Sequence, residues 1–188
     1  MNYKNIWENE ILIKVLKGGG IVVMPTDTIY GIVGAALNEA TVLRIYEIKK
    51  TAPEKPFIIL IGDINEIEKF SVVLSSEQKN IIKNYWPGPV SIIFDCLEDS
   101  FTYLHRGTKT LAFRLPQNID LQNLLNKTGP LVATSSNRAA LPAAKNTTEA
   151  KNYFDDQVDL YMDGGEISGK PSKLIRLHKD GSVSILRE

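Results

Sequence analysis

The sequence predicts an α/β fold in which helices flank a twisted sheet of mixed parallel and antiparallel strands. Early in the chain, segments with apolar residues at helical spacing alternate with short apolar runs of the kind found in buried strands. Later, strand-like segments follow one another without helices, and the sequence His-Lys-Asp-Gly (178–181) separates the last two as a hairpin turn would. The sheet should therefore contain both kinds of strand pairing.

Each element has its own signal in the sequence. Apolar residues from Trp7 to Leu16 recur at helical spacing and stop at three glycines, residues 18–20. Capping-box spacing, Asp63 with Glu66 and Ser75 with Gln78, predicts a short helix and then a longer one that ends near Trp86. Further helices are expected at 39–49, 119–127 and 147–154, and strands at 21–24, 57–61, 90–94, 110–115, 131–134, 158–162, 172–177 and 182–187.

Composition narrows the class of protein. The 188 residues are 43% hydrophobic and 23% charged, which suits one globular domain over residues 1–188. The 22 basic and 22 acidic side chains cancel, so no overall field attracts nucleic acid or an anionic membrane. A polyanion would have to meet a local basic patch.

Cysteine, histidine and hydropathy exclude several further classes. A single cysteine cannot form an internal disulfide, and two histidines give no cluster with metal-ligand spacing. No basic and apolar leader opens the chain, and no window holds eighteen apolar residues. A soluble protein of the cytoplasm is expected, with no membrane partner.

Polar segments interrupt the chain where apolar strands begin or end. They are PTDT at 25–28, RLP at 114–116, TSSN at 134–137 and GKPS at 169–172. Any one of them can be an ordinary turn, since Pro, Ser, Thr, Asp and Asn are turn formers. Ligands of open α/β sheets bind beyond strand ends, so four such segments together favour a polar cleft.

Two groups of cations stand out. Lys49, Lys50 and Lys55 follow the helix expected at 39–49, where either a solvated helix end or a phosphate site accounts for them. Neither G-x-x-x-x-G-K-[ST] nor G-x-G-x-x-G occurs, so a nucleotide would bind without a standard loop. Arg114 lies within an apolar strand and needs an anion, either an internal carboxylate or the carboxylate or phosphate of a ligand.

Seven motifs follow one another along the chain: PTDTIYG (25–31), KKTAPEKPFIILI (49–61), WPGPVSIIF (86–94), LAFRLP (111–116), GPLVATSSN (129–137), DGG (163–165) and GKPS (169–172) with the terminal ILR (185–187). In this order they are similar to the motifs of the YrdC/TsaC family of threonylcarbamoyl-AMP synthases. The resemblance implies a YrdC-like fold around a large, positively lined cavity. It also implies a reaction in which L-threonine, bicarbonate or CO₂ and ATP give threonylcarbamoyl-AMP and pyrophosphate for tRNA modification.

The resemblance also assigns residues to the two substrates. It implies that threonine contacts Thr28, Arg114, Ala133 and Ser172. It implies that ATP contacts Lys49, Lys50, Thr51, Lys55, Thr110, Ser135, Asn137 and Arg187, of which Lys49, Ser135 and Asn137 are the catalytic candidates. Thr51 replaces the usual Arg of a K-x-R pair, and Leu60 stands where some members have His. Without the Arg fork, either Lys50 reaches the phosphates as a point charge or the chain is a weaker synthase.

The implied chemistry needs no protein nucleophile and no protein-bound metal. Positioned cations and hydroxyl groups would suffice, with Mg²⁺ carried by ATP as the only cofactor. The partners implied are the three small substrates and downstream threonylcarbamoyl transferase proteins, with a contact to tRNA or double-stranded RNA as a further option. The alternative function is a non-enzymatic protein that binds structured RNA at a basic cavity mouth, with an affinity that falls steeply with salt.

Overall fold

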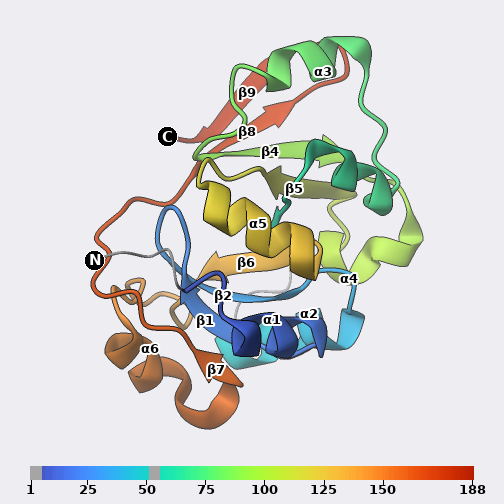
Figure 1. Ribbon diagram of the computed structural model, residues 1–188. Coiled ribbons are helices and arrows are strands. Elements are labelled where there is room, and N and C mark those ends of the chain that lie inside the picture. The colour runs from blue at the N-terminus through green and yellow to red at the C-terminus, as the bar shows by residue number, and fades with distance from the viewer. Residues whose placement is uncertain (1–5, 51–55) are drawn as a thin grey trace.

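A twisted sheet dominates the computed structural model, which describes residues 6–50 and 56–188 (Figure 1). These residues form nine strands in the spatial order β7-β1-β2-β6-β3-β5-β4-β8-β9. The strands are β1 (Val22–Pro25), β2 (Tyr30–Ala35), β3 (Ile58–Leu60), β4 (Val90–Asp95), β5 (Thr110–Arg114), β6 (Leu131–Ser135), β7 (Leu160–Tyr161), β8 (Lys173–Leu177) and β9 (Val183–Arg187).

The pairing of the strands is mixed, as the sequence predicts. Strand β1 pairs parallel with β7, β3 with β5, and β4 with β8. The other neighbours are antiparallel, among them the β1–β2 hairpin and the terminal β8–β9 hairpin. The α/β fold with a mixed sheet is therefore confirmed, including the hairpin at residues 178–181.

Helices cover both faces of this sheet (Figure 1), and a polar side chain caps the first turn of most of them. The α-helices are α1 (Glu10–Lys17), α2 (Glu39–Lys49), α3 (Ser76–Ile82), α4 (Thr102–His105), α5 (Ile119–Thr128) and α6 (Thr147–Phe154), with 3₁₀ turns η2 (Ile64–Phe70), η3 (Asp99–Phe101) and η4 (Asp155–Gln157). Asparagine side chains cap α1, α2, α5 and α6, because their carbonyl oxygens accept otherwise unpaired backbone N–H groups. None of the helices in the described ranges has the length and apolar character needed to cross a membrane.

Two hydrophobic clusters pack on opposite faces of the sheet. In β1, Val22 and Met24 join the cluster that α1 and α5 cover, whereas Val23 points into the cluster formed with α2, α3, α4 and α6. This alternation is the two-residue period of a strand. Both faces of β1 are buried, which explains why the run reads as uniformly apolar rather than alternating.

The structure departs from the expected elements in several places, and η3 and α4 lie where no element was predicted. Residues 30–35 form a strand that the sequence analysis missed, because Gly31 and Gly34 weaken its strand signal. The helix that starts after Ser75 has the predicted capping box but ends at Ile82 instead of near Trp86. Glu66 accepts from the Gly62 N–H rather than closing a capping box with Asp63, and the strand expected over 158–162 shrinks to two residues.

Candidate active site

A cavity of about 810 Å³ opens on the sheet, on the face that α1 and α5 partly cover. Alternate residues of the central strands line it: Ile58 and Leu60 of β3, Thr110, Ala112 and Arg114 of β5, and Ala133 and Ser135 of β6. They share one face because strand side chains alternate. Small side chains at Ala112, Ala133 and the neighbouring Gly31 leave the room that larger residues would fill.

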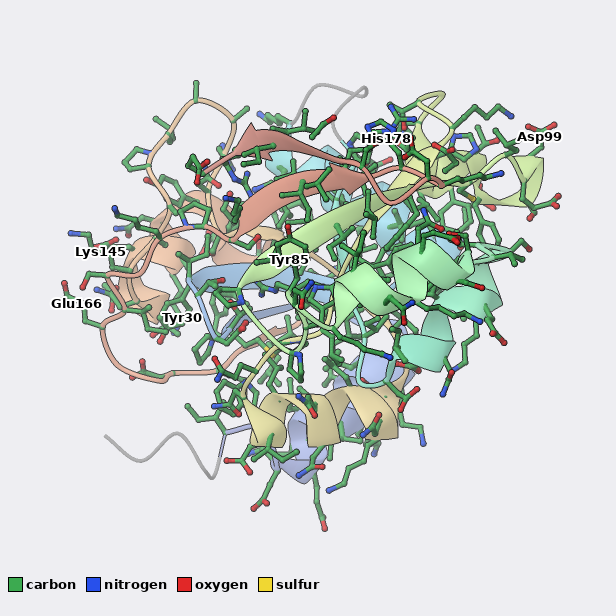
Figure 2. The ribbon with its side chains drawn as sticks, turned by 90° about the horizontal axis from the view of Figure 1, so that it is seen from above. Tyr30, Tyr85, Asp99, Lys145, Glu166 and His178 are labelled. Atoms are coloured by element: carbon green, nitrogen blue, oxygen red, sulfur yellow. The ribbon has the colours of Figure 1, made fainter. Side chains whose placement is uncertain are left out.

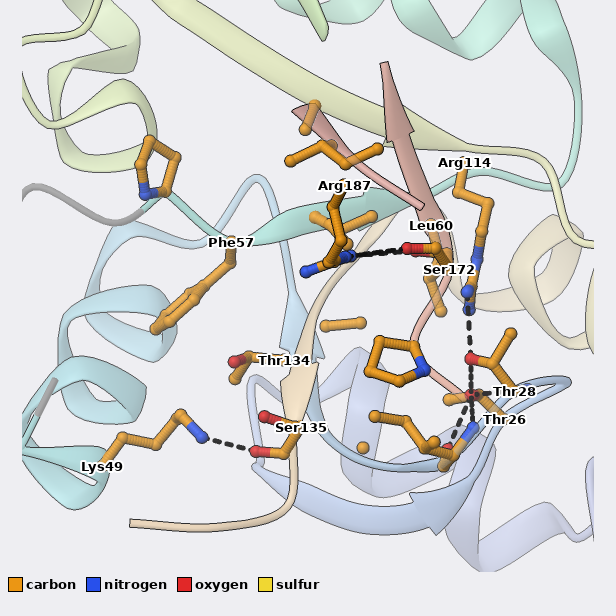
Figure 3. Close-up of a pocket in the computed structure, with 18 of the residues that line it drawn as sticks. Thr26, Thr28, Lys49, Phe57, Leu60, Arg114, Thr134, Ser135, Ser172 and Arg187 are labelled. Carbon is orange, nitrogen blue, oxygen red and sulfur yellow. Dashed lines mark hydrogen bonds between the residues drawn. The ribbon is translucent and has the colours of Figure 1, made fainter. Parts of the chain in front are cut away.

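Arg114 marks one end of the cavity (Figure 3). Its side chain is 4% exposed, and its two terminal nitrogens donate to Asp27 Oδ1 at 2.8 Å and to Thr28 Oγ1 at 3.0 Å. Its Nε is buried and has no hydrogen-bond partner among the described residues. Burial lowers the pKa of Arg114, and the charge of Arg187 lowers it further, although Asp27 opposes both. Within the site, therefore, one donor of Arg114 remains open.

The hairpin turn between β1 and β2 holds the partners of Arg114. Thr26 Oγ1 donates to the Ile29 carbonyl oxygen at 2.7 Å, lies 3.1 Å from Thr28 Oγ1 and accepts from the Thr28 N–H. A Cβ on Gly169 would lie 1.9 Å from the Thr28 carbonyl oxygen, so the 163–172 segment passes directly against this turn. That segment is also fixed by Tyr30, whose hydroxyl accepts from Gly164 N–H and donates to the Gly165 carbonyl. Figure 2 shows Tyr30 on the same side of the molecule as Lys145 and Glu166.

Lys49 marks the other end of the cavity (Figure 3). It ends α2, is 3% exposed, and donates from Nζ to the carbonyl oxygens of Ser135 and Asn137 and to Asn137 Oδ1. Ser135 Oγ donates to the same Oδ1 at 2.6 Å. Burial lowers the pKa of Lys49 to about 8. Lys49, Ser135 and Asn137 thus form one hydrogen-bonded cluster.

Arg187 and Ser172 lie between these two ends. Arg187 of β9 donates from Nε and from one Nη to the Ser172 carbonyl oxygen, at 3.0 and 2.7 Å. Ser172 Oγ lies 2.8 Å from Ser91 Oγ of β4, and both serines are buried. Strand β9 is therefore joined to the cavity wall in two ways: its backbone pairs with β8, and the Arg187 side chain donates to the Ser172 carbonyl oxygen.

The structure gathers most of the predicted site residues in this cavity. Its lining includes Thr28, Lys49, Thr110, Arg114, Ala133, Ser135, Asn137, Ser172 and Arg187. Lys50 is exposed at the C-cap of α2 and is not part of the lining, whereas Lys49 is buried and not a solvated helix end. Thr51 and Lys55 lie outside the described residues. The sequence left open whether Arg114 pairs with an internal carboxylate or with a ligand, and the structure shows an internal partner, Asp27.

Several residues of the site escaped the sequence analysis. Asp27 and Thr26 lie in the PTDT motif but had no assigned role, and Ser91 had none either. Phe57 lines the cavity and stacks on Tyr46 with ring centroids 4.0 Å apart. A sequence signal was available for Asp27, because a buried Arg114 requires an anion and Asp27 is the carboxylate of a polar segment that follows an apolar strand.

Comparison with known proteins places the chain in a family. The Sua5/YciO/YrdC family model, described as "Telomere recombination", matches residues 14–188. A putative threonylcarbamoyl-AMP synthase of Methanocaldococcus jannaschii is 33% identical over 94% of this chain and 83% of its own length. The threonylcarbamoyl-AMP synthase of Bacillus subtilis is 29% identical over 80% of this chain and 44% of its own length.

A solved structure agrees with these sequence matches. Pyrococcus abyssi Sua5, determined in complex with L-threonine, superposes with a TM-score of 0.83 at 28% identity, over 94% of this chain and 52% of Sua5. The chain therefore spans about half the length of Sua5 and of the Bacillus relative, and most of the Methanocaldococcus one. It belongs to the Sua5/YciO/YrdC family, in which the Bacillus relative is named a threonylcarbamoyl-AMP synthase and the Methanocaldococcus relative a putative one.

Proposed function

We propose that this chain is an L-threonylcarbamoyl-AMP synthase, which converts L-threonine, bicarbonate or CO₂ and ATP into threonylcarbamoyl-AMP and pyrophosphate. The arrangement that carries this function is a single cavity with an open arginine donor at one end and a lysine cluster at the other. Its volume lies in the range of small-molecule sites, at the upper end, which suits two ligands side by side. The names of its relatives support the same reaction.

Threonine is assigned to the Arg114 end. The free Nε of Arg114 lies in the plane of a guanidinium fork, whose geometry matches a carboxylate. Thr28 and Ser172 offer hydroxyl groups near that fork, and Leu60 and Ala133 offer a small apolar wall to a methyl group. The amino acid would thus be held by its carboxylate with its side chain against the wall.

ATP is assigned to the Lys49 end and the middle of the cavity. Lys49 and Arg187 supply positive charge there, and Ser135, Asn137 and Thr110 supply polar side chains. Thr51 and Lys55, which lie outside the described residues, are also proposed as nucleotide contacts, whereas Lys50 is exposed and off the cavity lining, so only a weak contact is proposed for it. No group of three His, Cys, Asp or Glu side chains in residues 6–50 and 56–188 is placed to hold a metal ion, so Mg²⁺ would enter as part of the MgATP substrate.

The proposed chemistry has two steps. The lone pair of the neutral threonine amine attacks CO₂, a C–N bond forms as one C=O π pair moves onto oxygen, and the nitrogen passes its proton to water to give a carbamate. A carbamate oxygen then attacks the α-phosphorus of ATP, and the bond from that phosphorus to the bridging oxygen breaks, releasing pyrophosphate. Positioning of the substrates and neutralisation of the developing negative charge account for the catalysis.

The product is a mixed anhydride and reacts readily with nucleophiles, so a transferase must use it soon after release. We propose that downstream threonylcarbamoyl transferase proteins pass the group to tRNA in the cytoplasm. Direct binding of tRNA or double-stranded RNA by this chain is the competing proposal. It predicts an RNA affinity that needs no ATP and falls steeply with salt.

Pyrophosphate release tests the function directly. Protein, MgATP, bicarbonate and threonine are incubated together, and pyrophosphate is measured with and without threonine. Threonine-dependent release, with threonylcarbamoyl-AMP detected by mass spectrometry, is the expected result. No release above the threonine-free control, under conditions in which the Bacillus subtilis relative is active, would disprove the proposed reaction.

A further inference from the structure

Asp27 holds Arg114 from outside the cavity. Its carboxylate is only 10% exposed, accepts from an Nη of Arg114 at 2.8 Å, and does not belong to the cavity lining. Thr28, the next residue, accepts from the other Nη at 3.0 Å. The two terminal nitrogens of the guanidinium are thus anchored to consecutive residues of one hairpin turn.

Two such anchors fix the direction of the third donor. The guanidinium is planar, so fixing both Nη contacts also fixes where the Nε–H points. That Nε is buried and unpartnered among the described residues, which suits a donor kept for a ligand. The turn itself is held by Thr26 and by the close passage of Gly169 against Thr28.

We propose that Asp27 is a positioning residue for the amino-acid substrate: it orients the Arg114 guanidinium so that its open edge meets the substrate carboxylate. The inference rests on the proposed function, because it takes an amino-acid carboxylate as the ligand of Arg114. Asp27 acts through Arg114 and touches no substrate atom.

Stability alone does not explain this ion pair. Burial raises the pKa of Asp27 and lowers that of Arg114, and in both cases the loss of water outweighs the attraction between the partners. Buried ion pairs of this kind add little net stability, and apolar replacements are often as stable. What the pair supplies is a defined orientation of a long side chain that would otherwise sample many rotamers.

Two substitutions separate the position of the Asp27 oxygen from its charge. Asp27→Asn removes the charge but keeps an acceptor oxygen at the same place, so Arg114 keeps its orientation. Asp27→Glu keeps the charge but moves the carboxylate outward by one methylene, so Arg114 must turn. Positioning predicts a threonine KM within about threefold of wild type for Asp27→Asn and about tenfold higher for Asp27→Glu. The ATP KM should change less than twofold in both.

Asp95→Asn is the matched control. Asp95 pairs with Arg176 at 2.8 Å between β4 and β8, but both side chains are about two-fifths exposed, and neither lines the cavity. Its threonine KM should equal that of wild type, and a thermal unfolding transition confirms that each variant is folded. The inference is overturned if Asp27→Glu has the wild-type threonine KM, or if Asp27→Asn raises it as much as Asp27→Glu does.

A second measurement keeps the inference separate from the proposed function. If wild type releases no pyrophosphate, the proposed function fails, and nitrogen-15 NMR of the arginine side chains decides about Asp27. The Arg114 Nε–H signal is assigned by its absence in Arg114→Lys. It should keep its position in Asp27→Asn and shift in Asp27→Glu. An unchanged signal in Asp27→Glu overturns the inference.

Discussion

The two ends of the cavity solve the same problem, a buried cation, in different ways. Arg114 has a buried carboxylate, Asp27, as counter-ion, and keeps one donor open. Lys49 has three neutral acceptors on the 135–137 segment, and no acidic side chain of the described residues pairs with it. Its pKa falls to about 8 because burial is not balanced by a negative charge.

This difference suits different ligands. A compensated arginine adds little net charge but offers a shaped donor edge, which favours one planar carboxylate. An uncompensated lysine is a point of positive charge, which a polyphosphate would neutralise. The electrostatic cost of burying Lys49 in the empty cavity is then offset when the nucleotide binds.

Removing the arginine should have the largest effect. We expect Arg114→Ala to lower kcat/KM for threonine by about ten- to 150-fold, because a charged hydrogen bond to the substrate is lost. The ATP KM should change less than twofold. The fold should survive, because burial already raises the pKa of Asp27 and the loss of Arg114 raises it further, which makes protonation of the unpaired carboxyl easier. Steady-state pyrophosphate release at varied threonine measures the effect.

Arg114→Lys sharpens the test. It keeps a positive charge beside Asp27 but removes the planar fork, so a loss close to that of Arg114→Ala would show that geometry matters more than charge. Wild-type threonine kinetics in Arg114→Ala would contradict the assignment of this end of the cavity to threonine.

Removing the lysine should affect the other substrate. Lys49→Ala should lower kcat/KM for ATP by about tenfold, the low end for a charged contact, and should leave the threonine KM nearly unchanged. Lys179 is a matched control, since it is exposed in the β8–β9 turn. If Lys179→Ala has an equal effect, or if Lys49→Ala raises the threonine KM instead, the two ends are not specialised as proposed.

The lowered pKa of Lys49 predicts opposite trends of activity and stability with pH. Above about pH 8 the ammonium of the free protein loses its proton, so kcat/KM for ATP at saturating threonine and bicarbonate should fall by about tenfold per pH unit. A lysine exposed to water, as in the unfolded chain, has a pKa of 10.5, so the unfolded chain binds more protons between pH 8 and 10.5. The contribution of Lys49 to the free energy of unfolding should rise over that range.

Lys49→Met provides the comparison for both trends. It lacks the titrating group, so the difference in urea unfolding free energy between wild type and variant should change with pH only above about 8. An ATP profile in wild type that stays flat to pH 9.5 would contradict the role of the Lys49 charge.

Much of the fold could be predicted because its signals are local. Helix α2 was predicted with its observed bounds, from apolar spacing and from the break that follows it. Strand β2 was missed because Gly31 and Gly34 carry no strand preference, and its pairing with β6 depends on residues a hundred positions away. The sheet order likewise depends on long-range contacts, which no local pattern contains.

The site was partly predictable for the same reason. Arg114 stood out because a charge in an apolar strand needs a partner. The sequence also predicted that polar segments next to apolar strands form a cleft, and PTDT, which contacts Arg114, is one of these segments. Lys49 was harder, because a lysine at a helix end looks solvated, and only the packing of α2 against the 135–137 segment buries it. The role of Asp27 depends on the hairpin turn, whose position against β5 is a tertiary feature.

The smallest effect is expected from the segment that follows Lys49 in the sequence, where Thr51 replaces an arginine of the family pattern. Lys50 is exposed, has a left-handed backbone (φ 50°) and does not line the cavity, so it is poorly placed to substitute for that arginine. Lys50→Ala should therefore reduce ATP turnover less than twofold. Thr51→Arg should raise wild-type activity several-fold and at most about tenfold, one charge-assisted contact at the low end of its range. Steady-state rates of the two single variants and the double variant measure both effects.

A tenfold loss in Lys50→Ala that Thr51→Arg restores would mean that Lys50 does reach the phosphates. No change in any variant would mean that position 51 does not face the nucleotide, and among the described residues Lys49, with Arg187 beside it in the middle of the cavity, would then supply the positive charge that meets the phosphates.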